Sequence, residues 1–95
     1  MTRVVVRLPA VLAEHADGRR SLEVDVPAGG TVGQVLDALT ECRPRLAWRV
    51  RDETGAVRRH VNVYVGEDDV RTAAGLATPV SDGDVVTVLP SVAGG

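Results

Sequence analysis

The residues at the end of the chain are the ones whose types and order point most directly to chemistry. Val92, Ala93, Gly94 and Gly95 follow a strand-like segment that stops at Pro90. Two residues without a Cβ atom can enter a narrow channel in a partner enzyme, where a side chain would clash. We expect the free carboxylate of Gly95 to be presented at the tip. A carboxylate needs activation before it accepts a nucleophile, and because the chain has no phosphate-binding loop, we expect ATP and a partner enzyme to supply it.

Other reactive side chains favour structural roles. Cys42 is the only cysteine, and its place at the end of a predicted helix favours a packed or half-buried thiol over a sulfur-carrying one. His15 and His60 are far apart and lack metal-ligand spacing, so we expect no metal site. The run Glu67-Asp68-Asp69 lacks the spaced ligands of a calcium loop and predicts a solvated turn. No nucleophile is accompanied by a base, so we expect a protein that is not an enzyme.

Charge and hydropathy narrow the possible partners. The 95 residues carry a net charge of -2, which argues against nucleic acid and anionic membranes as partners. Arg49, Arg51, Arg58 and Arg59 form a basic patch on a solvated loop, with docking to an acidic partner surface as the alternative. We find no signal peptide and no apolar run of membrane-spanning length, and a single cysteine suits a reducing interior. These features predict a cytoplasmic protein.

Hydrophobic alternation predicts the strands of a sheet. Segments 4–8 and 21–26 alternate apolar with polar residues and form a loosely connected hairpin, with residues 10–20 as the connection. Segment 61–65 is the clearest strand, and segment 85–89 is the last. Glycine and acidic residues predict turns at 17–18, 66–69 and 82–84, and residues 75–81 are a further loop or short strand.

One helix is predicted with its boundaries. Thr31 and Gln34 have the spacing of a capping box, and Pro44 bounds the helix at its far end. Between them an apolar stripe follows helical spacing at Val32, Val35, Leu36 and Leu39. Residues 45–60 are predicted to be an irregular excursion with some strand character, because apolar residues alternate there at Leu46, Trp48 and Val50.

These elements assemble into one domain. One main helix packed on a mixed sheet is a two-layer α+β architecture, and a helix placed after the first hairpin makes it a β-grasp. We expect the domain to occupy residues 1–90 and a flexible, extended Gly-Gly tail to occupy 91–95. If the buried valines of the strands face the helix, the open face of the sheet carries Val5, Tyr64 and Leu89. This apolar docking patch beside the root of the tail is a surface for a partner protein.

The motifs of the C-terminal third resemble those of the ubiquitin-like sulfur carriers. They are Val61-Asn62-Val63-Tyr64-Val65, Asp69-Val70-Arg71, Asp82-Gly83-Asp84-Val85 and Pro90-Ser91-Val92-Ala93-Gly94-Gly95. This family includes the small subunit of molybdopterin synthase, the thiamin sulfur carrier and the actinobacterial carrier for cysteine synthesis, and the chain most resembles the last. Gly66 stands where the family usually has Asn, and Pro90-Ser91 where molybdopterin carriers often have two prolines. These departures bear on which subfamily the chain resembles and not on its resemblance to the family.

The resemblance implies a cycle that is run by partner enzymes. An E1-like adenylating enzyme uses ATP to convert the Gly95 carboxylate to an acyl-adenylate, and a sulfur source then converts it to a thiocarboxylate. A sulfur-accepting synthase receives the sulfur; in the cysteine pathway the acceptor is an activated serine, and a metal-dependent peptidase later releases the cysteine. The resemblance implies that Ala93 and Gly94, with little or no side chain, let the end of the chain extend into a narrow channel of the partner. The domain itself is implied to bind no cofactor.

Other functions are compatible with the same residues. Within the class, molybdopterin, thiamin or a sulfur-containing secondary metabolite are alternative destinations for the sulfur. A ubiquitin-like protein modifier would use the same tail to join Gly95 to an amine of a target protein. A plain β-grasp interaction module would have an incidental Gly-Gly end, since the chain has 10 glycines and frayed ends are common.

Overall fold

The computed structural model describes residues 1–90, whose strands form one mixed sheet in the order β2-β1-β5-β3-β4. Strand β1 runs parallel to β5 and antiparallel to β2, and β3 is antiparallel to both β5 and β4. The strands are β1 (Thr2–Arg7), β2 (Ser21–Val26), β3 (Val61–Val65), β4 (Asp68–Asp69) and β5 (Val85–Pro90). The helices are α1 (Ala10–Ala13), α2 (Val32–Cys42) and α3 (Pro44–Val50), with single 3-10 turns η1 (Glu14–Ala16), η2 (Val70–Thr72) and η3 (Gly75–Ala77).

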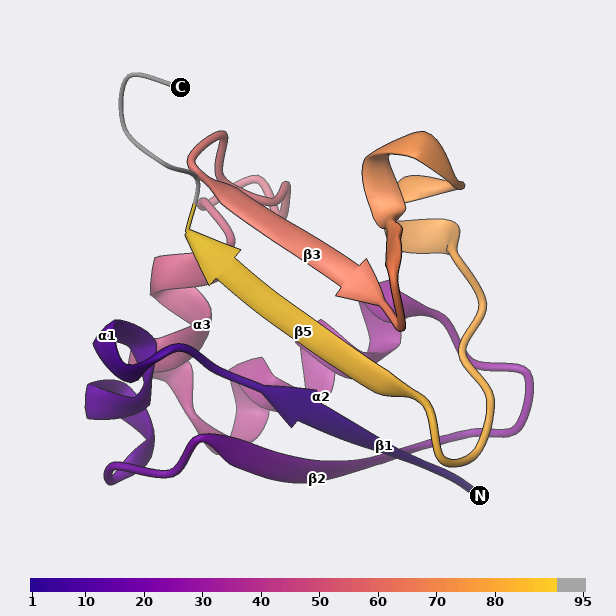
Figure 1. Cartoon of the computed structure of the whole chain (residues 1–95), viewed down its shortest axis with the longest axis horizontal. Coiled ribbons are helices and arrows are strands. Elements are labelled where there is room, and N and C mark those ends of the chain that lie inside the picture. The colour runs from indigo at the N-terminus through magenta and orange to yellow at the C-terminus, as the bar shows by residue number, and fades with distance from the viewer. Residues whose placement is uncertain (91–95) are drawn as a thin grey trace.

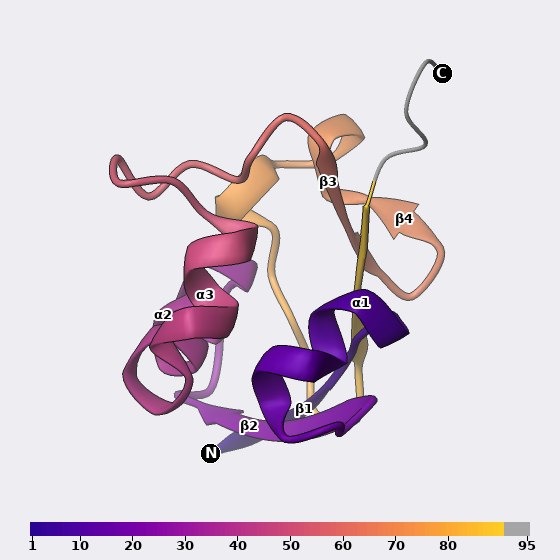
Figure 2. The ribbon, with the colours of Figure 1, turned by 90° about the vertical axis from the view of Figure 1, so that its left-hand side faces the viewer.

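The helices cover one face of the sheet. Figure 1 looks onto the sheet with α2 and α3 behind it, and Figure 2, turned by a quarter, shows the sheet nearly edge-on with these helices to one side. The other face carries no helix in the described part of the chain. This arrangement confirms the predicted two-layer α+β architecture, with its main helix following the first hairpin.

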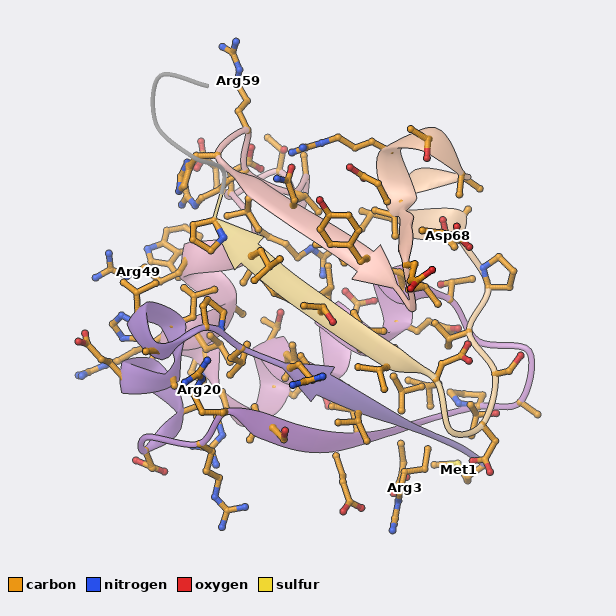
Figure 3. The ribbon with its side chains drawn as sticks, viewed as in Figure 1. Met1, Arg3, Arg20, Arg49, Arg59 and Asp68 are labelled. Carbon is orange, nitrogen blue, oxygen red and sulfur yellow. The ribbon has the colours of Figure 1, made fainter. Side chains whose placement is uncertain are left out.

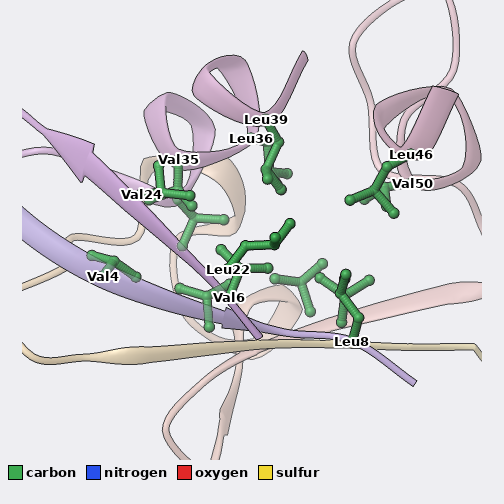
Figure 4. Close-up of a cluster of buried hydrophobic side chains, with 14 of the residues drawn as sticks. Val4, Val6, Leu8, Leu22, Val24, Val35, Leu36, Leu39, Leu46 and Val50 are labelled. Atoms are coloured by element: carbon green, nitrogen blue, oxygen red, sulfur yellow. The ribbon is translucent and has the colours of Figure 1, made fainter. Parts of the chain in front are cut away.

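The core lies between the sheet and the helices. Alternate strand side chains point toward α2 and α3, as Figure 4 shows for the first hairpin. The burial pattern of β2 follows this alternation without a break, and β1 follows it with one half-buried position. The largest fully buried side chains are Leu36, Leu46, Val4, Val6, Val26, Val32, Val35, Val50, Val61, Val63, Val86 and Val88.

The start of α2 has the predicted capping box. The Thr31 hydroxyl accepts the backbone N–H of Gln34 at 3.4 Å, and the Gln34 side chain accepts the N–H of Thr31 at 3.0 Å. Gly30 precedes this cap, and a Cβ atom there would lie 2.9 Å from the carbonyl oxygen of Pro27. A side chain at Gly30 would therefore push the helix away from the strand before it.

The prediction for residues 45–60 was wrong in its first half, where the chain forms α3. Leu46 and Val50 are buried on one side of this helix, whereas Trp48 is 58% exposed. Leu46 and Val50 are four residues apart, which is the spacing of neighbours on a helix as well as of side chains on one face of a strand. Pro44 occupies the first turn of the helix, where its missing N–H costs nothing.

Three further segments refine or correct the prediction. The predicted connection at 10–20 contains α1 and η1, and its turn at Asp17 and Gly18 is present, with positive φ at both. Residues 75–81 form a loop, one of the two predicted alternatives, with η3 and an isolated bridge from Pro79 to Thr31. The short strand is β4 at 68–69, inside the predicted turn. A strand of two residues, such as β4, is too short to show alternation of apolar and polar residues, and it forms only because β3 lies beside it.

We predict that Leu36→Ala lowers the free energy of unfolding by about 3 kcal/mol, because its side chain is 1% exposed and truncation leaves a cavity. Urea denaturation of the purified chain measures this change. The matched control is Leu89→Ala, which truncates a side chain that is 40% exposed and should cost less than about 1 kcal/mol. Equal losses for the two variants would contradict the assignment of Leu36 to the core.

Candidate functional site

The predicted reactive residues, Val92, Ala93, Gly94 and Gly95, lie outside the residues that the structure describes. The structure does describe the point from which they depart. Pro90 is the last residue of β5 and pairs with Val61 of β3. Strand β5 has a neighbour on each side, and its residues Val86 and Val88 are fully buried. The base of the tail is therefore held at the end of a central strand.

The side chain of Arg71 binds the start of β3, whose first residue, Val61, pairs with Pro90. Its guanidinium donates to the carbonyl oxygen of Val61 at 2.6 Å, to the side-chain oxygen of Asn62 and, at 3.2 Å, to the carbonyl oxygen of Arg58. Hydrogen bonds from a charged donor are stronger than those between neutral groups. Arg71 belongs to one of the motifs that resemble the family, but its contacts could not be predicted, since the carbonyls it binds are distant in sequence.

The predicted docking residues Val5, Tyr64 and Leu89 all lie on the open face of the sheet. Val5 and Tyr64 are half-buried, and Leu89 is 40% exposed. They are not in adjacent positions, because Val5 pairs with Val85, Tyr64 with Thr87 and Leu89 with Asn62. Val85 and Thr87, which sequence analysis did not include, fill the strip of β5 between them.

Charged side chains border this apolar strip on its β2 side. Arg3 forms ion pairs with Asp25 at 3.0 Å and with Glu23 at 3.1 Å. The hydrogen bond from Arg3 lowers the pKa of the Asp25 carboxyl below its usual value, and Asp25 in turn raises the pKa of Arg3. An apolar centre with a charged border is the usual composition of a protein interface.

The four arginines of the predicted basic patch differ in their contacts: two are hydrogen-bonded within the domain, and two are exposed. Arg51 donates to the carbonyl oxygen of Gly55 and to Asp37, both at 2.7 Å. Arg58 donates to the carbonyl oxygen of Trp48 at 2.9 Å, and its guanidinium lies 5.7 Å from the centre of the indole ring. These two side chains hold the loop against α2 and α3, so the prediction of a merely solvated loop was wrong for them.

The two remaining arginines of that patch lie apart. Figure 3 shows Arg49 and Arg59 projecting in different directions from the body of the domain, and both are exposed. Arg49 instead lines a surface pocket with Arg58, Trp48 and His60. Docking of an acidic partner surface at these arginines stays a prediction.

The other candidate side chains are dispersed. Cys42 is exposed, so the prediction of a packed thiol was wrong. Asp69 accepts the N–H of Arg71 at 2.8 Å at the start of η2, next to the predicted turn. Among residues 1–90, no three His, Cys, Asp or Glu side chains gather closely enough to hold a metal ion. Within the same residues, every helix falls short of the length and apolar character needed to cross a membrane.

Known proteins match nearly the whole chain. The ThiS family model matches residues 6–95. Sulfur carrier protein CysO from Mycobacterium tuberculosis is 40% identical over 94 residues, which cover 97% of this chain and 98% of that protein. Small archaeal modifier protein 1 from Haloferax volcanii is 39% identical, covering 94% and 97%. A chain in the crystal structure of the Amycolatopsis orientalis BexX/CysO complex matches with a TM-score of 0.84 and 38% identity, covering 97% and 99%.

We predict that Arg71→Ala lowers the free energy of unfolding by about 1–2 kcal/mol, because it leaves several oxygens at the start of β3 without their charged donor. Denaturation measures the global effect, and amide hydrogen exchange at Val61 and Asn62 measures the local one. Arg59→Ala is the control, since the Arg59 side chain makes no hydrogen bond or ion pair within residues 1–90. Unchanged exchange in Arg71→Ala would show that β3 does not depend on this arginine.

Proposed function

The chain belongs to the ThiS family of ubiquitin-like sulfur carriers. We propose that Gly95 carries the sulfur as a thiocarboxylate and that this sulfur is used for cysteine synthesis. Its relatives are carriers and small modifiers, so the chain is a carrier and not an enzyme. The observation that carries the proposal is the likeness to sulfur carrier protein CysO, which extends over nearly the full length of both proteins.

The chemistry follows from the unreactive character of a carboxylate. In the proposed first step, a Gly95 carboxylate oxygen attacks the α-phosphorus of ATP in a partner enzyme, and pyrophosphate leaves. Hydrosulfide then attacks the acyl carbon of the adenylate, and the C–O bond to AMP breaks. The product is a thiocarboxylate whose sulfur is a good nucleophile toward an electron-poor carbon, such as the β-carbon of an activated serine. Its C–S bond to that carbon replaces the C–O bond to the activated oxygen, which departs as the leaving group. A sulfur-accepting synthase would hold that acceptor, and a metal-dependent peptidase would later release the cysteine.

The fold supports this proposal by fixing where the tail begins. Strand β5 is paired on both sides, and its last residue, Pro90, pairs with Val61. A partner that binds the domain therefore meets the end of β5 at a fixed position. The small side chains and two glycines of residues 91–95 suit a narrow channel leading to the adenylating site.

The docking patch is the surface we assign to the adenylating partner. Val5, Tyr64 and Leu89 lie on the open face, on the strand that leads into the tail or on strands beside it. A related carrier has been crystallised in the BexX/CysO complex, which supports a stable complex with a partner protein. Molybdopterin, thiamin and secondary-metabolite pathways remain alternative destinations for the sulfur, since these uses share the same tail chemistry.

The second candidate function is protein modification. It is supported by the 39% identity to small archaeal modifier protein 1, which extends over 94% of this chain. In this function an amine of a target protein, rather than hydrosulfide, would attack the activated Gly95 carbonyl and form an amide. This chain contains no lysine, so branched chains of the protein linked through its own lysine side chains are not possible.

We predict that incubation with a candidate adenylating enzyme, ATP and sulfide gives a mass gain equal to exchange of one oxygen atom for sulfur. Intact-protein mass spectrometry measures this gain, because a thiocarboxylate forms only after adenylation of the C-terminal carboxylate. Deleting Gly95 should abolish it, whereas Cys42→Ser should leave it unchanged. Adducts on cell proteins without any thiocarboxylate would favour the modifier, and the absence of both products with several active enzymes would contradict both functions.

We predict that Leu89→Asp weakens binding to the adenylating partner by about tenfold or more, because a charge then replaces an apolar contact within the proposed interface. Titration calorimetry measures the affinity, and thermal melting checks the fold. The matched control is Trp48→Asp, which places the same charge at an exposed apolar position on the helix-covered side. Unchanged affinity in Leu89→Asp would remove the docking patch from the model and leave the thiocarboxylate chemistry standing.

A further inference from the structure

Strand β2 is a long, regular edge of the sheet. It is the outermost strand on one side and pairs with β1 over six positions without a bulge. The opposite edge, β4, has only two residues. Proteins usually block edge strands with proline, bulges, charged side chains or very short length, because an open edge offers hydrogen bonds to another strand. Of these devices, Ser21–Val26 has only the charges of Glu23 and Asp25.

The outward backbone groups of β2 can be identified from its pairing. Leu8 donates to the carbonyl oxygen of Arg20 at 2.9 Å, and hydrogen-bonded pairs then recur at every second residue of an antiparallel ladder. Leu22 and Val24 therefore bond to β1, while the N–H and C=O groups of Glu23 and Asp25 point away from it. Within residues 1–90 these outward groups have no hydrogen-bond partner.

A groove of about 740 Å³ lies along this edge, between β2 and α2. Leu22 and Val24 of β2 line it together with Ala38, Leu39 and Cys42 of α2. The lining also includes Val5 of the docking patch and the charged side chains of Arg19, Glu23, Asp25, Glu41 and Arg43. An additional strand hydrogen-bonded to β2 would place every second side chain in this groove. Its lining is mixed, and the apolar part, at Leu22, Val24, Ala38 and Leu39, offers contacts to valine-sized side chains of an added strand.

The charges beside the edge decide what kind of strand fits. Glu23 and Asp25 point to the open face, and Arg3 alone pairs with both. If β2 paired with β2 of a second copy in the registers of greatest overlap, these carboxylates would lie opposite each other, which is unfavourable. A strand with basic side chains on that face is complementary instead.

We propose that the groove between β2 and α2 binds an extended segment of a partner protein, which adds to the sheet as a strand beside β2. The segment has apolar side chains in the groove and basic side chains opposite Glu23 and Asp25. Its backbone bonds to the outward N–H and C=O groups of these two residues. Strand β1 separates this site from β5, so the site provides a means of recruiting a target protein that is distinct from the tail.

The test uses the full chain, labelled with ¹⁵N, and a short capped peptide in which valine and arginine alternate. Amide exchange at Glu23 and Asp25 should slow by about tenfold or more at saturating peptide. A peptide methylated on alternate backbone nitrogens should bind about tenfold more weakly, since it cannot form the ladder. Replacing its arginines with glutamates should also weaken binding.

Modification of Cys42 offers a way to block the groove without substituting a buried residue. Alkylating its exposed thiol with a bulky maleimide should abolish peptide binding, whereas Cys42→Ser treated with the same reagent should bind like the untreated chain. Binding that is insensitive to the maleimide or to N-methylation, protection at other strands, or no binding at millimolar peptide would overturn the proposal. Concentration-dependent protection of the same amides without peptide would assign the edge to a second copy of the chain instead.

Discussion

The structure depends on one non-local pairing, the parallel ladder between the first strand and the last. Val5, Val6 and Arg7 of β1 meet Val85, Val86 and Thr87 of β5, although about 80 residues of chain separate them. Closing so long a loop costs conformational entropy that must be offset by burial of the strand side chains against the helices. The fully buried Val6 and Val86 provide part of this burial at the ladder itself. The base of the tail is therefore fixed only when the whole domain has folded.

The strand period divides the molecule into a face for stability and a face for contact. Along β5, Val86 and Val88 point to the core, whereas Val85, Thr87 and Leu89 belong to the open face. A substitution on the open face can change recognition with little cost in folding, since no helix covers that face within residues 1–90. A carrier that meets several enzymes in turn needs such a separation, because the contact residues can then be selected for partners alone.

The sequence predicted those features whose signals are local. The first hairpin, α2 with its capping box, β3 and β5 each have a clear period over five or more residues. The role of Gly95 stays a prediction, made from residue types and from the family resemblance. Helix α3 was missed because Leu46 and Val50 satisfy both periods in a short segment. The contacts of Arg58 and Arg71 were also missed, since each joins segments that only the folded chain brings together. The exposure of Cys42 depends on the direction in which the last turn of α2 faces, and one thiol carries no periodic signal.

The topology limits where a partner strand could join this domain. β5 and β1 each have neighbours on both sides, whereas β3 pairs with β5 along its length but with β4 only at Tyr64 and Val65. β4 is too short to guide an added strand, which leaves β2 as the one long edge among residues 1–90. The same order that places β5 at the centre, and so fixes the base of the tail, also places β2 at the margin. A carrier proposed to hand over sulfur through its tail thus retains an edge for which the transfer chemistry has no use. The free backbone groups of that edge lie beside a groove, and only the charges of Glu23 and Asp25 restrict which strand can join it.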